Sequence, residues 1–323
     1  MLVLWSNHRK GGIIKVVKKV LTTILVLIVA LVAFYYAFPE KVAGYMTAAA
    51  RSYAGLTKKE IKIDDHNIVY LEGGKGPTIL LLHGYTGSKD NWTTFAAYLT
   101  KNYHVVIPDI PGYGESSMIE KDSYNVSNQM PRLHKFVQAI ELKKFHIAGN
   151  SMGGGYAGAY AVRYPDEIIS LGLFDAGGVM FSGNSVEKTI KEGGENPFLI
   201  RDSNEMQQMI EILYVNPPSL PYPIKKVMTQ TATANRQFYE KEAKEVFPDL
   251  YSLEKDLPKI KAPTLILWGD QDKVVDISSV PIFEKGLKNH KTVIIKDCGH
   301  VPMVEKPKET ATQYLDFIKG IKI

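Results

Sequence analysis

The chain has 323 residues, with 39 basic and 34 acidic side chains and a formal net charge of +5. Five basic residues precede residue 20, so the rest of the chain is balanced in charge and gives no electrostatic basis for nucleic-acid binding. The single cysteine, Cys298, excludes an intramolecular disulfide, and the length is enough for one large domain with an insertion.

A basic tail at 1–19 leads into an apolar segment, Val20–Phe38, which contains no charged residue, glycine or proline. As a helix rising about 1.5 Å per residue, this segment spans roughly 28 Å, close to the hydrocarbon thickness of a bilayer. A secretory signal has a shorter apolar region with a small-residue cleavage site directly after it, whereas the nearest small-residue run here is 48–50. We expect an uncleaved transmembrane anchor; the alternatives are a removed signal peptide and a buried soluble helix.

The charges around the apolar segment predict its orientation. All five cations of the tail precede it, so the tail is expected to stay in the cytoplasm and the rest of the chain to face the periplasmic or extracytoplasmic side. Four basic residues soon after the segment oppose this orientation: Lys41, Arg51, Lys58 and Lys59.

After a linker at 39–60, strand-like apolar runs alternate with helical patterns, which predicts an α/β fold with a mostly parallel sheet and helices on both faces. The alternation stops at 179–258, where the pattern is helical. We therefore expect a core in two parts, 61–178 and 259–323, with an inserted helical cap between them. The predicted strands are 61–72, 78–82, 104–108, 145–148, 169–174, 264–268 and 292–296.

The turn after the strand at 78–82 reads His83-Gly84-Tyr85. A backbone N–H group in such a turn can stabilise the oxyanion that forms when a nucleophile attacks a carbonyl group, and we expect Tyr85 to provide one such N–H group. His83 is interpreted as a structural hydrogen-bonding residue that holds this turn and not as a catalytic residue.

The segment Gly149–Gly153 fits the pattern G-x-S-x-G, between a strand and a helix rich in small residues. A sharp strand-to-helix turn lifts the middle side chain clear of the sheet and requires neighbours that are nearly free of side chains. Ser151 is therefore predicted to be a nucleophile, and the Met152 N–H to be the second oxyanion donor. The alternative is a glycine-rich loop with a solvated serine.

A serine nucleophile needs a base and a group that orients the base. His300 is predicted to be the base, because it lies in a turn directly after the strand at 292–296. Cys298 in the same turn is interpreted as a small buried residue and not as a competing nucleophile.

Three aspartates at strand ends are candidates for the orienting acid. Asp270 and Asp272 follow the strand at 264–268, and Asp272 is favoured because the first carboxylate in such a turn usually caps backbone amides. Asp175 follows the strand at 169–174 and remains an alternative acid.

The motifs that combine in this chain are His83-Gly84, Asp109–Ser116, Gly149–Gly154, Trp268–Asp272, and Gly299-His300 followed by Glu305–Pro307. In their order and spacing they resemble the α/β-hydrolase superfamily from about residue 61 to the C-terminus. Within it, the chain is most similar to membrane-anchored monoacylglycerol lipases and related bacterial lipases and esterases. The resemblance implies Ser151 as nucleophile, Asp272 as acid, His300 as base, and Tyr85 and Met152 as oxyanion amides.

These features predict a serine hydrolase of carboxylic esters with lipid or other amphiphilic substrates, monoacylglycerols among them, acting at a bilayer. Methionine, phenylalanine, tyrosine and leucine in the cap favour an acyl-chain site, although the same residues can simply pack the cap onto the core. Two alternatives stay open: hydrolysis of a carbon–carbon bond or a non-lipid ester by the same residues, and an inactive membrane-tethered binding protein. No metal-ligand spacing and no G-x-G-x-x-G after a first strand is present, so no cofactor is predicted, and no protein partner is indicated.

Overall fold

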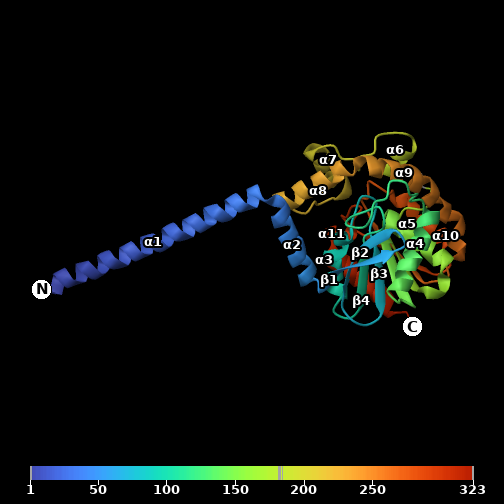
Figure 1. Ribbon diagram of the computed structural model, residues 1–323. Coiled ribbons are helices and arrows are strands. Elements are labelled where there is room, and N and C mark those ends of the chain that lie inside the picture. The colour runs from blue at the N-terminus through green and yellow to red at the C-terminus, as the bar shows by residue number, and fades with distance from the viewer. Residues whose placement is uncertain (1, 181–182, 184, 322–323) are drawn as a thin grey trace. The chain divides into compact units, whose positions relative to one another are not determined.

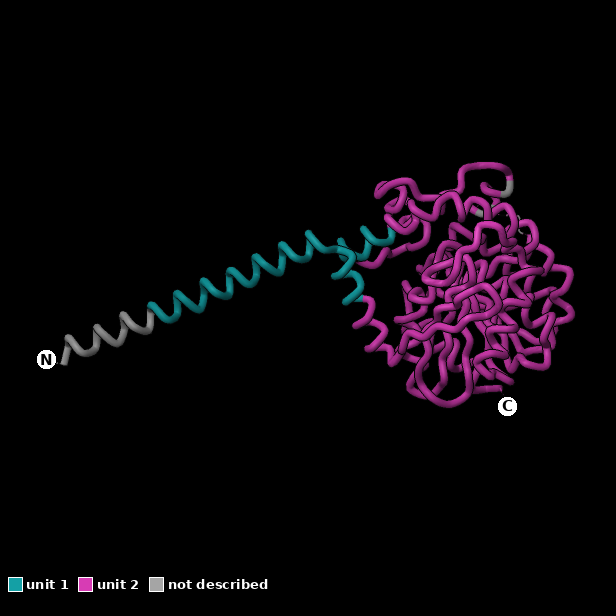
Figure 2. The backbone as a smooth tube through the Cα atoms, viewed as in Figure 1, with its two compact units in different colours: residues 1–46, 220–228 teal, residues 47–219, 229–323 magenta. Residues whose placement is uncertain are grey.

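The computed structural model describes residues 2–180, 183 and 185–321 (Figure 1). The chain divides into two compact units, shown in different colours in Figure 2. The first contains the N-terminal residues up to Met46 together with Leu220–Met228, and the second contains Thr47–Ser219 and Thr229–Ile323.

The first unit is helical. Helix α1 covers Leu2–Ala37, and its segment Lys15–Ala37 is long and apolar enough to cross a membrane, with none of that stretch buried. The helix ends before Phe38 because the proline that follows disfavours helical backbone at the preceding residue. The apolar helix predicted from the sequence is therefore present, and it is a candidate membrane anchor.

The second unit is built on an eight-stranded sheet with the order β1-β2-β4-β3-β5-β6-β7-β8. Its strands β3 to β8 are parallel, whereas β1 pairs antiparallel with β2, and β2 with β4. The predicted mostly parallel sheet is confirmed. The strands are β1 Leu56–Ile63, β2 His66–Gly73, β3 Thr78–Leu82, β4 His104–Pro108, β5 Phe145–Asn150, β6 Ile168–Phe174, β7 Thr264–Gly269 and β8 His290–Ile295.

The first part of the predicted core differs from the expectation. The run at 61–72 was predicted as one strand, but it contains a hairpin whose turn lies between β1 and β2, with Asp64 at φ 51°. Aspartate tolerates this left-handed conformation better than most residues, which lets the chain reverse there. The predicted linker at 39–60 contains helix α2, Pro39–Tyr53, because a proline suits the first position of a helix and an alanine-rich run follows.

Helices cover both faces of the sheet. On one face α3 packs with α12 around a core that includes Trp92, Phe95, Phe174 and Tyr314. On the other face α5 lies against β5 and β6 and contacts α4. The core helices are α3 Thr93–Leu99, α4 Val126–Ala139, α5 Met152–Arg163, α10 Val280–Gly286, α11 Pro302–Glu305 and α12 Pro307–Lys319, with short 3-10 turns η1 Lys89–Trp92, η2 Pro165–Glu167, η3 Tyr251–Lys259 and η4 Ile277–Ser279.

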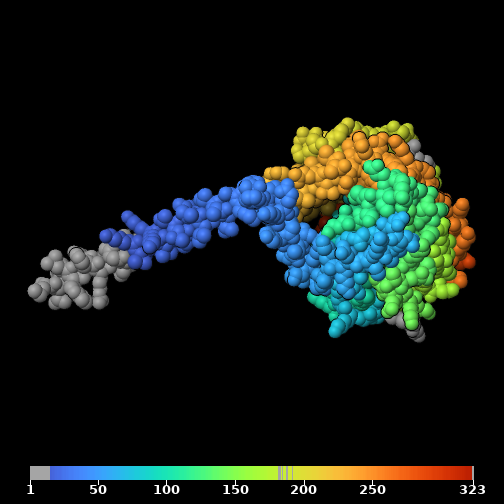
Figure 3. Space-filling view, viewed as in Figure 1, coloured from blue at the N-terminus to red at the C-terminus, as the bar shows by residue number. Residues whose placement is uncertain are grey.

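Between β6 and β7 the chain is helical, in the region where the sequence predicts a cap. Its helices are α6 Val186–Lys191, α7 Ser203–Leu213, α8 Tyr222–Ala234 and α9 Arg236–Leu250. Helix α9 packs against α4 and α5, and Figure 3 shows its orange surface beside the green surface of α4. The limits 179–258 for the cap stay a prediction.

Candidate active site

The turn between β5 and α5 holds Ser151 in a strained conformation, with φ 56° and ψ −125°. Glycines flank it because there is no room for side chains. A Cβ atom on Gly149 would lie 2.0 Å from the Gly153 carbonyl oxygen, and one on Gly153 would lie 2.4 Å from the carbonyl oxygens of Leu82 and His83. Strain of this kind persists only where the surrounding structure enforces it, so the serine is held out from the sheet by packing.

The histidine and aspartate predicted from the sequence lie together at the carboxyl ends of β7 and β8. His300 Nδ1 and Asp272 Oδ2 are 2.8 Å apart, and both side chains are buried. The Asp272 Oδ1 atom accepts hydrogen bonds from the backbone N–H groups of Val274 and Val275 at 2.7 and 3.1 Å. A carboxylate so engaged accepts the Nδ1 proton of the imidazole, which leaves Nε2 free for a proton transfer.

The other two candidate acids make different contacts. Asp270 Oδ1 accepts a hydrogen bond from the Cys298 N–H at 3.3 Å and so supports the histidine loop. Asp175 is fully buried and accepts a hydrogen bond from the Gly269 N–H at 2.8 Å. The structure thus pairs His300 with Asp272 and places Asp175 close behind this pair.

The Asn150 side chain connects the turn that carries Ser151 to the backbone of His300. Asn150, the residue before Ser151, donates from Nδ2 to the carbonyl oxygens of His300 at 2.9 Å and Phe174 at 3.1 Å. No hydrogen bond joins the Ser151 hydroxyl to the His300 ring in the described part of the chain. Catalytic hydrogen bonds are often long before substrate binds, so the arrangement is compatible with both residues facing one substrate.

The loop after β3 lies directly against the serine. A Cβ atom on Gly84 would lie 3.1 Å from the Ser151 Cβ atom. His83 fixes this loop: its Nδ1 donates to the Gly84 carbonyl oxygen at 2.8 Å, and its Nε2 accepts from the Ile110 N–H at 3.0 Å. Burial lowers the pKa of His83, which keeps the ring neutral with this pattern of donor and acceptor.

Two backbone N–H groups next to the serine are available to a ligand. Met152 begins α5, so its N–H has no acceptor within the helix. Neither this group nor the Tyr85 N–H makes a hydrogen bond to another residue among those described. The Tyr113 hydroxyl contacts the Met152 sulfur at 3.4 Å and packs against this position from the loop after β4.

The cap contacts the site from two helices. The His300 N–H donates to the Leu213 carbonyl oxygen at the end of α7, at 2.9 Å. The Tyr85 hydroxyl donates to the Tyr239 carbonyl oxygen in α9, at 2.6 Å. The loop after β3 and the loop that carries His300 are therefore both hydrogen-bonded to the helical region predicted as the cap.

The sequence also did not predict a second buried carboxyl group, Glu242 of α9. It is fully buried next to Gly112, where a Cβ atom would come within 2.2 Å of the Glu242 Oε1 atom, and its oxygens have no hydrogen-bond partner among the described residues. Burial raises its pKa to about 9, against a smaller lowering by the Tyr113 hydroxyl. The available signal was a glutamate at helical spacing between Tyr239 and Val246, on the apolar face of α9.

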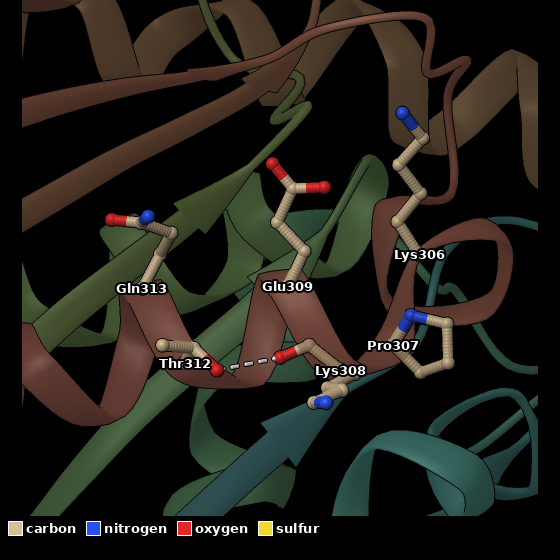
Figure 4. Close-up of a pocket in the computed structure, with 6 residues that line it drawn as sticks. All are labelled: Lys306, Pro307, Lys308, Glu309, Thr312 and Gln313. Atoms are coloured by element: carbon tan, nitrogen blue, oxygen red, sulfur yellow. Dashed lines mark hydrogen bonds between the residues drawn. The ribbon is translucent and has the colours of Figure 1, made fainter.

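A group of three possible metal donors and a surface hollow were also found among the described residues. Donor atoms of Asp175, Asp272 and His300 lie within 4.8 Å of one another, but the histidine and Asp272 are already bonded to each other. A hollow of about 470 Å³ lies on α12, and Figure 4 shows its lining, which includes no residue of the candidate active site. Its lining residues are Lys306, Pro307, Lys308, Glu309, Thr312 and Gln313.

Comparison with known proteins assigns the family. A profile described as the alpha/beta hydrolase family matches residues 79–313, more than half of the chain. The chain belongs to the α/β-hydrolase family. The α/β-hydrolase is 30% identical over 313 residues to the monoacylglycerol lipase ABHD6 of Homo sapiens, an alignment that covers 93% of both chains. It is 37% identical over 256 residues to Lipase 1 of Psychrobacter immobilis, covering 77% of this chain and 80% of that lipase.

Solved structures agree with the assignment. The structure of a membrane phospholipase A, described as a bacterial virulence factor, is 41% identical to this α/β-hydrolase with a TM-score of 0.83, covering 94% of this chain and 98% of the other. The resemblance and fold class predicted from the sequence are confirmed. The chain is an enzyme, a hydrolase of the lipase and esterase type.

Proposed function

We propose that this α/β-hydrolase is a serine hydrolase of lipid carboxylic esters, with monoacylglycerols as the leading substrate class. The observation that carries the proposal is the buried His300–Asp272 pair, with its 2.8 Å contact, at the sheet edge where the strained Ser151 also lies. The chemistry of this arrangement is acyl transfer through a covalent serine intermediate.

The reaction begins when the Ser151 hydroxyl attacks the ester carbonyl carbon and His300 Nε2 takes its proton. The N–H groups of Tyr85 and Met152 donate to the oxyanion that forms, a contribution of about 10²–10³-fold per donor. His300 returns the proton to the departing alcohol, and an acyl-enzyme remains. A water molecule activated by His300 then releases the fatty acid, while Asp272 keeps the imidazole in the productive tautomer.

Three features support a lipid substrate. The names of similar proteins include monoacylglycerol lipase, lipase and membrane phospholipase A. Helix α1 would hold the enzyme at a bilayer, where amphiphilic esters are concentrated. Two methionines of α7, Met206 and Met209, are buried in the cap, and flexible thioethers adapt to alkyl chains.

The test is hydrolysis of an ester panel by the full chain in detergent. The panel runs from short p-nitrophenyl esters through mono-, di- and triacylglycerols to a diacyl phospholipid, with Ser151→Ala as the inactive variant and Ser203→Ala, an exposed serine of the cap, as the matched control. Turnover that depends on Ser151 and favours monoacylglycerols supports the proposal. Serine-dependent turnover of the phospholipid alone would support the mechanism but would show that phospholipids, and not monoacylglycerols, are the substrate class.

Loss of all serine-dependent ester turnover would overturn the proposal. In that case labelling by an active-serine phosphonate separates the two remaining alternatives. A labelled enzyme points to hydrolysis of a carbon–carbon bond, and an unlabelled one to a binding protein that has lost the chemistry.

We further propose that α1 remains uncleaved and that the catalytic unit faces the periplasmic or extracytoplasmic side. The cations that precede the apolar stretch support this orientation. Protease added to intact cells lacking an outer barrier would degrade the catalytic unit in this orientation. Full protection, with degradation only after lysis, would reverse the assignment.

A further inference from the structure

Asp175 is a buried carboxyl that the proposed reaction does not use. It follows β6 directly, adopts the left-handed conformation with φ 45°, and is completely buried. Its Oδ1 atom accepts the Gly269 N–H at 2.8 Å, whereas its Oδ2 atom has no hydrogen-bond partner among the described residues. Donor atoms of Asp175, Asp272 and His300 lie within 4.8 Å of one another.

Two carboxyl groups this close in a buried site do not both ionise, because neither is screened by water. The surroundings decide which group keeps the proton. Asp272 accepts two backbone N–H groups on Oδ1 and the imidazole on Oδ2, and each of these hydrogen bonds favours its ionised form. Asp175 accepts a single backbone N–H, so the proton belongs on Asp175.

The position of that proton follows from the hydrogen bonds. Because Oδ1 of Asp175 already serves as an acceptor, the proton belongs on Oδ2. A buried oxygen without a partner is costly, and a proton on Oδ2 turns it into a donor, with the Asp272 carboxylate near enough to accept.

The other charged or titratable groups near Asp175 do not change this distribution. Glu305 of α11 adds a negative charge, and it accepts the Gly299 N–H at 2.8 Å; Cys298 of the histidine loop is a buried thiol. Burial, followed by the charge of Asp272, raises the pKa of Asp175 well above its ordinary value.

We propose that Asp175 is a neutral carboxylic acid that donates a hydrogen bond from Oδ2 to Asp272 and so acts as a positioning residue for the His300–Asp272 pair. It does not touch substrate. Its hydrogen bond holds the Asp272 carboxylate in place. Because Asp175 is neutral, Asp272 alone supplies the negative charge that balances the imidazolium formed on His300 during turnover. The kinetic part of this inference rests on the proposed function; the protonation state does not.

Infrared spectroscopy of the full chain in detergent at pH 7 tests the protonation state directly. The measurement uses a Glu242→Gln background, because Glu242 is a second buried carboxyl with a raised pKa. A C=O stretching band of a protonated carboxylic acid is expected in this background, and it should disappear when Asp175→Asn is added. Absence of the band, or its survival in Asp175→Asn, would overturn the proposal whatever the enzyme hydrolyses.

Kinetics on the best ester test the positioning role. Asp175→Asn keeps a donor, suits the left-handed backbone and keeps position 175 neutral. The value of kcat and the acid limb of the pH profile of kcat/KM should therefore stay close to wild type. Asp175→Ala should lower kcat about tenfold with KM little changed, because only the hydrogen bond is lost.

The opposite charge state gives a distinct kinetic result. If Asp175 were ionised, it would raise the affinity of His300 for a proton. Asp175→Asn would then move the acid limb to lower pH, and such a shift would contradict the proposal. If kcat were the same in Asp175→Ala and wild type, Asp175 would have no positioning role.

Discussion

Two buried carboxyl groups, one at the sheet edge and one in the cap, differ in the hydrogen bonds that the fold provides for them. Asp272 at the end of β7 has hydrogen bonds on both oxygens, from two backbone N–H groups and from His300. Glu242 of α9 is as deeply buried, but neither oxygen has a hydrogen-bond partner of good geometry among the described residues, and the nearby Tyr113 hydroxyl offsets the effect of burial only in part.

The difference shows where the fold requires a charge. A carboxylate whose hydrogen bonds are complete stays ionised in a site without water and can orient a base. A carboxyl group without partners takes up a proton and contributes only to packing. The sheet edge is therefore suited to chemistry. The underside of the cap, where Glu242 lies against Gly112, is suited to packing.

The largest effect is expected from Asp272→Asn. An asparagine amide at this position donates toward His300 Nδ1 and stabilises the wrong tautomer, so kcat should fall about 10⁴-fold with little change in folding. Ester turnover and thermal unfolding measure the two quantities, and Asp270→Asn is the matched control. A loss below about tenfold would show that another carboxyl, Asp175 first, orients the base.

A smaller effect is expected from Asn150→Ala, which removes the hydrogen bond between the β5–α5 turn that carries Ser151 and the loop that carries His300. It leaves the His300 carbonyl oxygen without a donor among the described residues, at a cost of about 1–3 kcal/mol, whereas the Phe174 carbonyl oxygen still accepts the Ser151 N–H at 3.0 Å. Thermal unfolding should occur at lower temperature, and kcat should fall about tenfold as His300 loses its support. An unchanged kcat in a folded variant would mean that the histidine loop is positioned by other contacts.

Glu242→Gln tests whether the buried carboxyl group of the cap is neutral, through the pH dependence of folding stability. Burial raises the pKa of Glu242 from 4.5 to about 9 in the folded protein, so the folded state holds this proton more tightly than the unfolded chain. Its contribution to stability is complete below about pH 4.5 and is lost as the pH rises toward 9. Glutamine stays neutral, so the variant avoids that loss.

The measurement is Tm against pH for the wild type and Glu242→Gln, with Glu240→Gln as a control on the same helix. The Glu242 variant should unfold roughly 5 °C above wild type at pH 8, and the two should converge near pH 5. Parallel curves across this range would show that Glu242 is ionised in the folded state.

The smallest effect is expected from Tyr85→Phe. This change removes the 2.6 Å hydrogen bond from the oxyanion loop to the Tyr239 carbonyl oxygen in the cap, at a cost of about 1 kcal/mol. Tm should fall by roughly 3 °C while the backbone N–H of residue 85 is retained, so kcat should change little. Tyr239→Phe is the control, since its hydroxyl accepts one long hydrogen bond, at 3.5 Å, from Asn235. A large loss of kcat in Tyr85→Phe would make the cap contact part of the catalytic geometry.

Much of the fold could be read from local patterns. Buried parallel strands appear as short apolar runs, and the predicted strand 78–82 coincides with β3 and 104–108 with β4. The hairpin at 61–72 was missed because an apolar run hides a turn that depends on one aspartate, Asp64, in the left-handed region. Helix α2 begins inside the predicted linker, where Pro39 suits the first position of a helix.

Sequence alone determined the kinds of residue at the site and the sheet edge on which they lie, because glycine spacing and strand periodicity are local properties of the chain. It named Ser151 and His300 and favoured Asp272 as the acid on local grounds, but Asp270 and Asp175 stayed open as alternative partners of the histidine. The tertiary structure decided that pairing, together with the closeness of Asp175 and the burial of Glu242. These depend on distances between segments far apart in sequence, and a carboxyl group acquires its charge state from the neighbours that folding brings to it.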